Sequence, residues 1–193
     1  MKKQKIIAIT VIIITVILSM SASALAGYYS IGVGNGGDAE AKNLSLEVGS
    51  KNLKIRGKPV LAALGITVID HGDKDIPANT TNKPCEYDNY TSLGQKPDGV
   101  ETGLLGKLGL KSSFPKIYFS VLGGITQVNE IHLAQSNENP QTYYEQSSDK
   151  KYHGVYGISI GYFPEIFTWK LKLNMQIDYD NRRGVTGYLG WCW

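Results

Sequence analysis

The stretch FTWKLKLNMQIDYDNRRGVTGYLGWCW, from Phe167 to Trp193, decides the fold of this chain, because apolar and polar residues alternate along most of it. Between Trp169 and Asp180 the alternation is unbroken. Only a β-strand, whose side chains point to opposite faces in turn, sorts such a run into two sets. The apolar set is Trp169, Leu171, Leu173, Met175, Ile177 and Tyr179, and the polar set is Lys170, Lys172, Asn174, Gln176, Asp178 and Asp180.

A second strand follows after a turn at 181–184, and its apolar face also ends in aromatic residues. That face carries Val185, Leu189, Trp191 and Trp193. Apolar faces of about 9–11 residues suit strands that cross a bilayer at a tilt, and aromatic residues at their ends are typical of the two membrane interfaces. A soluble antiparallel β-sandwich or a lipocalin-like barrel would alternate in the same way and is the alternative.

The N-terminus has the three parts of a secretory signal peptide. Lysines at positions 2, 3 and 5 precede an apolar run from Ile6 to Met20, and Ala24-Leu25-Ala26 is a small-residue cleavage site. The apolar run is short for a transmembrane helix, which needs about 20 residues. We therefore expect residues 1–26 to be removed and residues 27–193 to form one domain.

Charge and composition narrow the class of protein. Residues 1–26 contain three of the 20 Lys and Arg residues, so the remaining chain has 17 of them against 17 Asp and Glu. A net charge of zero gives no support to a nucleic-acid partner. The chain is rich in Gly and Tyr, with Pro between the alternating runs, which is typical of an all-β protein with many turns.

Eight alternating segments can be followed along residues 27–193, and two of them are the runs already described. The other six are about 28–35, 43–49, 60–70, 100–110, 116–128 and 152–162, the second being open to continuation after a bulge through Leu53 and Ile55. Long polar segments follow the third and the fifth, whereas the turns after the fourth and the sixth are tight. An even number of strands places both termini at one end. Cys85 then lies at the opposite end from Cys192, so we expect two free thiols.

Together these features resemble the small eight-stranded outer-membrane β-barrels of Gram-negative bacteria, the OmpA/OmpX-like and OmpW-like families, which combine long loops on one side with short turns on the other. The ending Leu189-x-Trp191-x-Trp193 looks like the C-terminal signal read by the barrel-assembly machinery, although Tyr188 stands where the family usually has Gly. The resemblance implies an all-β, eight-stranded antiparallel up-and-down transmembrane barrel. It would lie in the bacterial outer membrane, in contact with lipid and lipopolysaccharide, with periplasmic termini.

An eight-stranded barrel has an interior just wide enough for side chains to fill it. The inward faces of the predicted strands carry charges of both signs, and we expect these to pair into a polar plug because unpaired buried charge is costly. The predicted plug is Glu47, Glu101, Lys107, Lys170, Lys172, Asn174, Gln176, Asp178 and Asp180. The predicted aromatic girdle is Tyr29, Phe119, Tyr156, Tyr162, Trp169, Tyr179, Trp191 and Trp193.

No residue pattern predicts catalysis, a metal ion or a cofactor. A lipid A deacylase would need a serine close to a histidine, but His153 is followed by Gly154-Val155-Tyr156. The acidic cluster at 70–75 lacks the spacing of a calcium loop and is expected to be solvated. Arg182 and Arg183, in the last hairpin, are also expected to be solvated, or to contact lipopolysaccharide phosphates.

The sequence thus predicts a non-enzymatic outer-membrane barrel that stabilises the envelope or binds a surface partner through extracellular loops at about 72–98 and 130–150. Three alternatives stay open: a narrow channel for small or hydrophobic solutes, an outer-membrane enzyme acting on lipid A, and a soluble periplasmic ligand-binding β-barrel. The lysines and aspartates between 169 and 180 count against an apolar, OmpW-like channel.

Overall fold

The computed structural model describes residues 27–72, 76–77, 79–81, 90–166 and 171–192, and every regular element in these ranges is a β-strand. None of the described residues belongs to a helix long and apolar enough to cross a membrane. In chain order the strands are β1 (Tyr28–Gly36), β2 (Ala41–Ile55), β3 (Lys58–Gly72), β4 (Thr80–Thr81), β5 (Tyr90–Lys111), β6 (Ile117–Ser136), β7 (Tyr143–Tyr162), β8 (Glu165–Ile166), β9 (Leu171–Asp180) and β10 (Gly184–Cys192).

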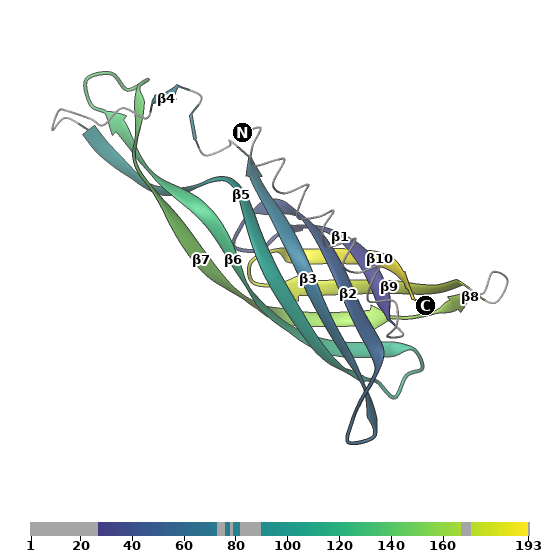
Figure 1. Ribbon diagram of the computed structural model, residues 1–193. Coiled ribbons are helices and arrows are strands. Elements are labelled where there is room, and N and C mark those ends of the chain that lie inside the picture. The colour runs from purple at the N-terminus through teal and green to yellow at the C-terminus, as the bar shows by residue number, and fades with distance from the viewer. Residues whose placement is uncertain (1–26, 73–75, 78, 82–89, 167–170, 193) are drawn as a thin grey trace.

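Eight of these strands close into an antiparallel barrel, as the sequence predicted (Figure 1). Their order is β7-β6-β5-β3-β2-β1-β10-β9, and pairing of β7 with β9 closes the ring. The two-residue strands β4 and β8 add to β7 and β9. Tyr28 lies opposite Cys192, so β1 begins where β10 ends. We call this opening of the barrel the terminus end and the opposite opening the rim.

The barrel wall has very unequal heights. Strands β5, β6 and β7 contain 22, 20 and 20 residues, whereas β1 and β10 contain nine each. Pairing of β3 with β5 stops at Gly72 and Gly99, and pairing of β7 with β9 stops at Gly157 and Asp180. Beyond these points β5, β6 and β7 continue together as a three-stranded extension, which we call the protruding sheet (residues 90–98, 129–136 and 143–153; Figure 1).

The protruding sheet corrects the predicted loops. Residues 90–98, 130–136 and 143–150 were expected to be loop, yet they are strand. Both faces of these segments are mainly polar, so they lack the apolar alternation by which the strand boundaries were predicted. The predicted continuation of β2 past a bulge is confirmed, because the pairing of β2 with β3 shifts between Ser50 and Leu53 and then runs on to Ile55.

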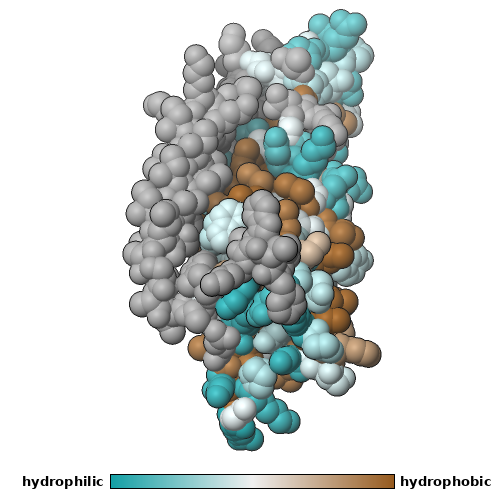
Figure 2. All heavy atoms as spheres, turned by 90° about the vertical axis from the view of Figure 1, so that its right-hand side faces the viewer, coloured by the Kyte–Doolittle hydropathy of each residue, from teal (hydrophilic) through white to brown (hydrophobic). Residues whose placement is uncertain are grey.

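The barrel is polar inside and apolar outside. Strand β10 is typical: its buried residues alternate with exposed ones such as Val185, Leu189 and Trp191. Exposed apolar side chains surround the middle of the barrel, and Figure 2 shows part of this belt as brown side chains between more hydrophilic ends. The belt comprises Ile31, Val33, Leu44, Leu64, Leu104, Leu108, Leu110, Phe119, Val121, Ile125, Tyr156, Ile158, Ile160, Tyr162, Met175, Ile177, Tyr179, Val185, Leu189 and Trp191.

The free edge of β7 begins where β9 ends, and Asn181 covers its first residues. The backbone N–H of Asn181 donates to the carbonyl of Tyr156 at 3.2 Å. Its side-chain Oδ1 accepts from the N–H of Tyr156 at 2.9 Å, and its Nδ2 donates to the carbonyl of Gly154 at 3.0 Å. Asn181 therefore continues the ladder of β9 with its side chain.

Asn181→Ala should lower the free energy of unfolding by about 1 kcal/mol, because two side-chain hydrogen bonds to backbone are lost. Hydrogen exchange should become faster at the amide of Tyr156 and stay unchanged at amides deep in the β1–β10 pair. Asn35→Ala, at an exposed position of β1, is the control. Equal exchange at Tyr156 in both variants would contradict the capping role.

Candidate functional site

Polar and charged side chains fill the lumen where a soluble barrel would hold an apolar core. They form three layers: an Arg182 cluster at the rim, a central network around Arg183 and Lys107, and an aromatic layer at the terminus end. Most residues predicted for the plug are buried inside the barrel, namely Glu47, Glu101, Lys107, Asn174, Gln176, Asp178 and Asp180.

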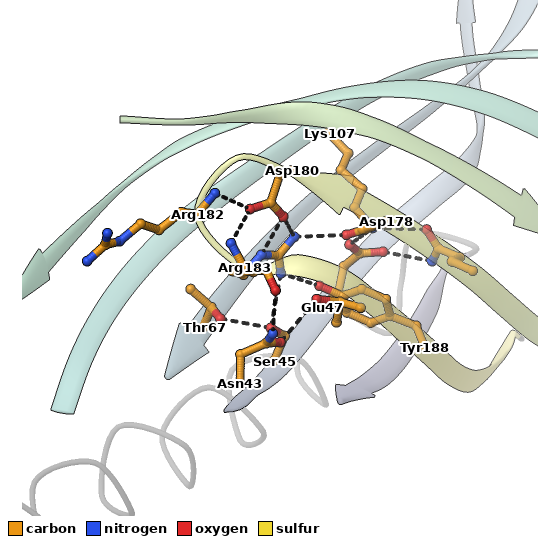
Figure 3. Close-up of polar contacts among 12 residues, drawn as sticks. Asn43, Ser45, Glu47, Thr67, Lys107, Asp178, Asp180, Arg182, Arg183 and Tyr188 are labelled. Carbon is orange, nitrogen blue, oxygen red and sulfur yellow. Dashed lines mark hydrogen bonds and ion pairs between the residues drawn. The ribbon is translucent and has the colours of Figure 1, made fainter. Parts of the chain in front are cut away.

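Arg183 is the centre of the network and the largest fully buried side chain of the described residues. Its Nε donates to Oδ2 of Asp180 at 2.7 Å, and its Nη2 lies 2.7 Å from the same oxygen and 3.1 Å from Oδ2 of Asp178. Its Nη1 donates to Oγ of Ser45 at 3.1 Å and to the Tyr188 hydroxyl at 2.7 Å. Each guanidinium nitrogen thus has a partner in the lumen (Figure 3).

Lys107 extends this network across the lumen from β5. Its Nζ lies 2.8 Å from Oδ1 of Asp178 and forms a second ion pair with Glu47. It also donates to Oε1 of Gln176 at 3.1 Å and sits 4.4 Å from the centre of the Tyr188 ring. Because Asp178 bonds to both Arg183 and Lys107, the two cations belong to one connected network.

A second ionic cluster lies closer to the rim. Arg182 holds Glu101 in a two-pronged contact, with Nε at 2.8 Å from Oε1 and Nη2 at 2.6 Å from Oε2. His71 Nε2 lies 2.8 Å from the same Oε2. The cluster therefore joins the last hairpin to β3 and β5 across the opening, and such paired arginine–carboxylate bonds fix orientation as well as charge.

Aromatic side chains close the lumen at the terminus end. The Phe163 ring packs edge-on against the rings of Tyr28 and Tyr118, with centres 5.3 Å apart in both pairs. Lys51 Nζ lies 5.0 Å from the centre of the Phe163 ring. The hydroxyl of Tyr28 donates to Oε1 of Glu47 at 2.8 Å, which connects this layer to the central network.

The last hairpin turns both arginines inward. Oδ1 of Asp180 accepts the backbone N–H groups of Arg182 and Arg183, at 3.1 and 2.7 Å. Gly184 then takes a φ of 68°, a left-handed conformation that favours glycine. Across the barrel Asn43 donates from Nδ2 to the carbonyl of Arg183 at 3.2 Å.

This arrangement corrects the prediction that Arg182 and Arg183 are solvated or reach lipopolysaccharide, since both are buried. Alternation gave no direction for them because they lie in a turn. Charge was the available signal, since the predicted lumen held four carboxylates, while its predicted lysines at 170 and 172 are far from Asp180 along the sequence. Lys172 is exposed, and Lys170 lies outside the described residues.

The charged partners of Arg183 also set its protonation. Burial alone would lower the pKa of its guanidinium, but the attraction of Tyr188, Asp180 and Asp178 outweighs this and holds the pKa above its usual value. Like other guanidinium groups in proteins, Arg183 is protonated and so brings a positive charge to Asp178 and Asp180.

The predicted girdle residues that the structure describes lie on the outside of the barrel. Phe119, Tyr156, Tyr162, Tyr179 and Trp191 are exposed, and Tyr29 is half-buried against Trp191, with ring centres 4.0 Å apart. Leu189 of the predicted assembly signal is also exposed. Trp169 and Trp193 lie outside the described residues.

The remaining candidates of the sequence do not form a reactive site among the described residues. His153 lies on β7 with Nε2 3.6 Å from Glu130, and His71 belongs to the rim cluster. No group of three or more metal-ligating side chains occurs in the described ranges. Cys192 is a buried free thiol, as predicted, whereas Cys85 lies outside those ranges.

The described lumen thus contains paired charges and packed rings. In the central network and the rim cluster, Lys107, Arg182 and Arg183 are each bound to carboxylates. No model of a known protein family matches the chain, and no curated protein matches it either. The function of the protein therefore has to be inferred from its own residues.

Proposed function

We propose that the protein is a non-enzymatic outer-membrane β-barrel that stabilises the envelope and presents the protruding sheet at the cell surface. The observation that carries this proposal is the inverted polarity of the barrel. Arg183 and Asp178 are fully buried, whereas Leu64 and Tyr156 are 71% and 70% exposed. Charged residues are rarely fully buried in soluble proteins, even though pairing as in Arg183 and Asp178 permits it, and large apolar residues seldom surround such a centre on the outside. A membrane-spanning barrel has this alternation, apolar outside and polar inside.

The closure of the barrel also supports a position in a lipid bilayer. A strand in a bilayer must satisfy all its backbone groups by pairing, and a closed sheet does this without a free edge. The apolar belt coincides with the closed part, where all eight strands are paired. The protruding sheet, whose edges are not closed, carries mainly polar residues and would stand in water.

The orientation follows from the two ends of the barrel. Residues 1–26 have the pattern of a cleaved secretory signal, which would deliver the chain to the periplasm. The connections described at the terminus end are all short, whereas the longest strands extend beyond the rim. Because short turns are periplasmic in outer-membrane barrels, the rim and the protruding sheet would face the outside. Leu189 and Trp191 lie on the outer face of the last strand, where the barrel-assembly machinery could reach them during insertion.

The filled lumen favours a structural role over transport. Side-chain contacts lie at the rim, at the centre and at the terminus end of the described barrel, and the central layer carries paired charges that an apolar solute would displace only at high cost. A specific partner would therefore meet the protruding sheet, because this is the part of the described chain that extends beyond the barrel.

The first experiment is fractionation combined with heat-modifiability. We expect the protein in the outer-membrane fraction, with an electrophoretic mobility in SDS that shifts after boiling, because a closed barrel resists SDS until heated. In planar lipid bilayers the purified protein should show no steady conductance. Release by osmotic shock without a mobility shift would refute the membrane assignment, and a steady conductance would replace the structural role with a channel.

A further inference from the structure

The terminus end of the barrel is strongly basic. Seven cationic side chains gather on the β2–β3 hairpin, on the ends of β5 and β6 and on β9. Against them the described part of this end carries the carboxylate of Glu165. The basic residues are Lys51, Lys54, Arg56, Lys58, Lys111, Lys116 and Lys172.

The rim and the protruding sheet have the opposite balance. Carboxylates outnumber lysines among the side chains described there. The carboxylates are Asp38, Glu40, Asp70, Asp98, Glu130, Glu138 and Asp149, and the lysines are Lys42, Lys96, Lys150 and Lys151. Residues 27–193 have no net charge, so the terminus end is basic because the fold distributes positive and negative side chains unevenly along the barrel axis.

Large apolar side chains are exposed at the same turns. On the β2–β3 hairpin Leu53 and Ile55 are 39% and 59% exposed, and they alternate with Lys54 and Arg56. Phe114, at the turn between β5 and β6, is 65% exposed. Basic and apolar side chains interleaved in this way are typical of segments that lie at the boundary between lipid headgroups and acyl chains.

These turns adjoin the apolar belt directly. Leu110, the belt residue nearest the end of β5, is opposite the buried Val60, which is opposite the exposed Leu53, so one row of the sheet leads from the belt to the hairpin. Lys54 and Lys111 are the next residues along their strands. Alternation turns Lys54 and Lys111 to the other face of the sheet, at the open end of the barrel, whereas Lys58 pairs with Ile55 and shares its outer face.

We propose that the terminus end binds the phosphate headgroups of anionic phospholipids in the leaflet that surrounds it. Lys58, on the same face as Ile55, and Arg56, in the turn, contact the phosphates, and the exposed Lys54 adds to the positive charge of the hairpin, while Leu53 and Ile55 enter the acyl boundary. This inference rests on the proposed membrane location. An acidic protein or polymer would also match the cations, but it would leave the exposed apolar residues of the hairpin without a partner.

The test compares phosphatidylglycerol with phosphatidylcholine. Native mass spectrometry of the detergent-purified full chain, given both lipids in equal amounts, should show preferential retention of phosphatidylglycerol. In the triple variant K54Q/R56Q/K58Q this preference should fall on the order of tenfold or more, since each basic residue near an anionic surface contributes attraction. Added salt should weaken the wild-type preference, because mobile ions screen exposed charges.

The matched control is K42Q/K96Q/K150Q, which removes three cations from the opposite end and should keep the preference for phosphatidylglycerol. Equal retention of both lipids by the wild type would overturn the proposal, as would an equal loss in both triple variants. Retention of polyglutamate in place of phosphatidylglycerol would assign the surface to an acidic macromolecule. Heat-modifiability is scored separately, so a wild-type barrel that is heat-modifiable but shows no preference for phosphatidylglycerol rejects this inference alone.

Discussion

Arg183→Ala should destabilise the barrel by about 3–5 kcal/mol, the cost expected when one partner of a buried ion pair is removed. The substitution leaves Asp178 and Asp180 buried, with one cation, Lys107, still in contact with Asp178. It also removes the donors to Ser45 and Tyr188. The variant should unfold at lower urea concentration in detergent micelles and lose its heat-modifiable mobility at a lower temperature.

Two further variants separate the charge of Arg183 from its volume. Lys42→Ala removes an exposed cation from the same side of the barrel and should leave the urea midpoint nearly unchanged. Arg183→Met in a D178N/D180N background removes the buried charges together with the arginine, and should recover much of the loss because no carboxylate is left unpaired. A wild-type midpoint for Arg183→Ala alone would mean that the central network does not hold the barrel.

Phe163→Ala should cost about 3–5 kcal/mol, as is typical when a buried aromatic side chain is removed and its cavity remains. Phe163 is 2% exposed and holds the rings of Tyr28 and Tyr118 across the terminus end. Without the Phe163 ring, the Tyr28 side chain is held less firmly, and its hydroxyl hydrogen bond to Glu47 weakens. The effect of the substitution therefore extends to the central network. Urea titration followed by tyrosine and tryptophan fluorescence measures the change.

The control for this prediction is Phe119→Ala, the same substitution on the outer face, where the ring is 51% exposed. Detergent surrounds the Phe119 ring in the folded barrel, so its removal opens no internal cavity and should cost much less. Equal losses for the two variants would show that Phe163 does not pack the lumen as described.

The closed barrel was predictable from the sequence because the period of two is local. The central part of each strand can be recognised by alternation, as in Met175, Gln176, Ile177 and Asp178. Eight such runs with both termini at one end leave few ways to close the sheet. The same parity correctly assigned Glu47, Lys107 and Asp178 to the inside. The position of each strand and the face of each of its residues depend only on neighbouring residues in the sequence.

Tertiary structure alone decided the rest. Alternation does not assign a face to a residue in a turn. The inward direction of Arg182 depended on Glu101 of a distant strand, whereas the carboxylates that hold Arg183 belong to β9 beside its own turn. The protruding sheet was not predicted because its strands are mainly polar in sequence, with Ile131 and Leu133 as a short apolar pair. Backbone pairing joins its distant segments, for example Glu130 with Asp149. Local alternation determines which side chains of a strand face the lumen. Contacts between side chains on opposite walls of the lumen form only when the sheet closes.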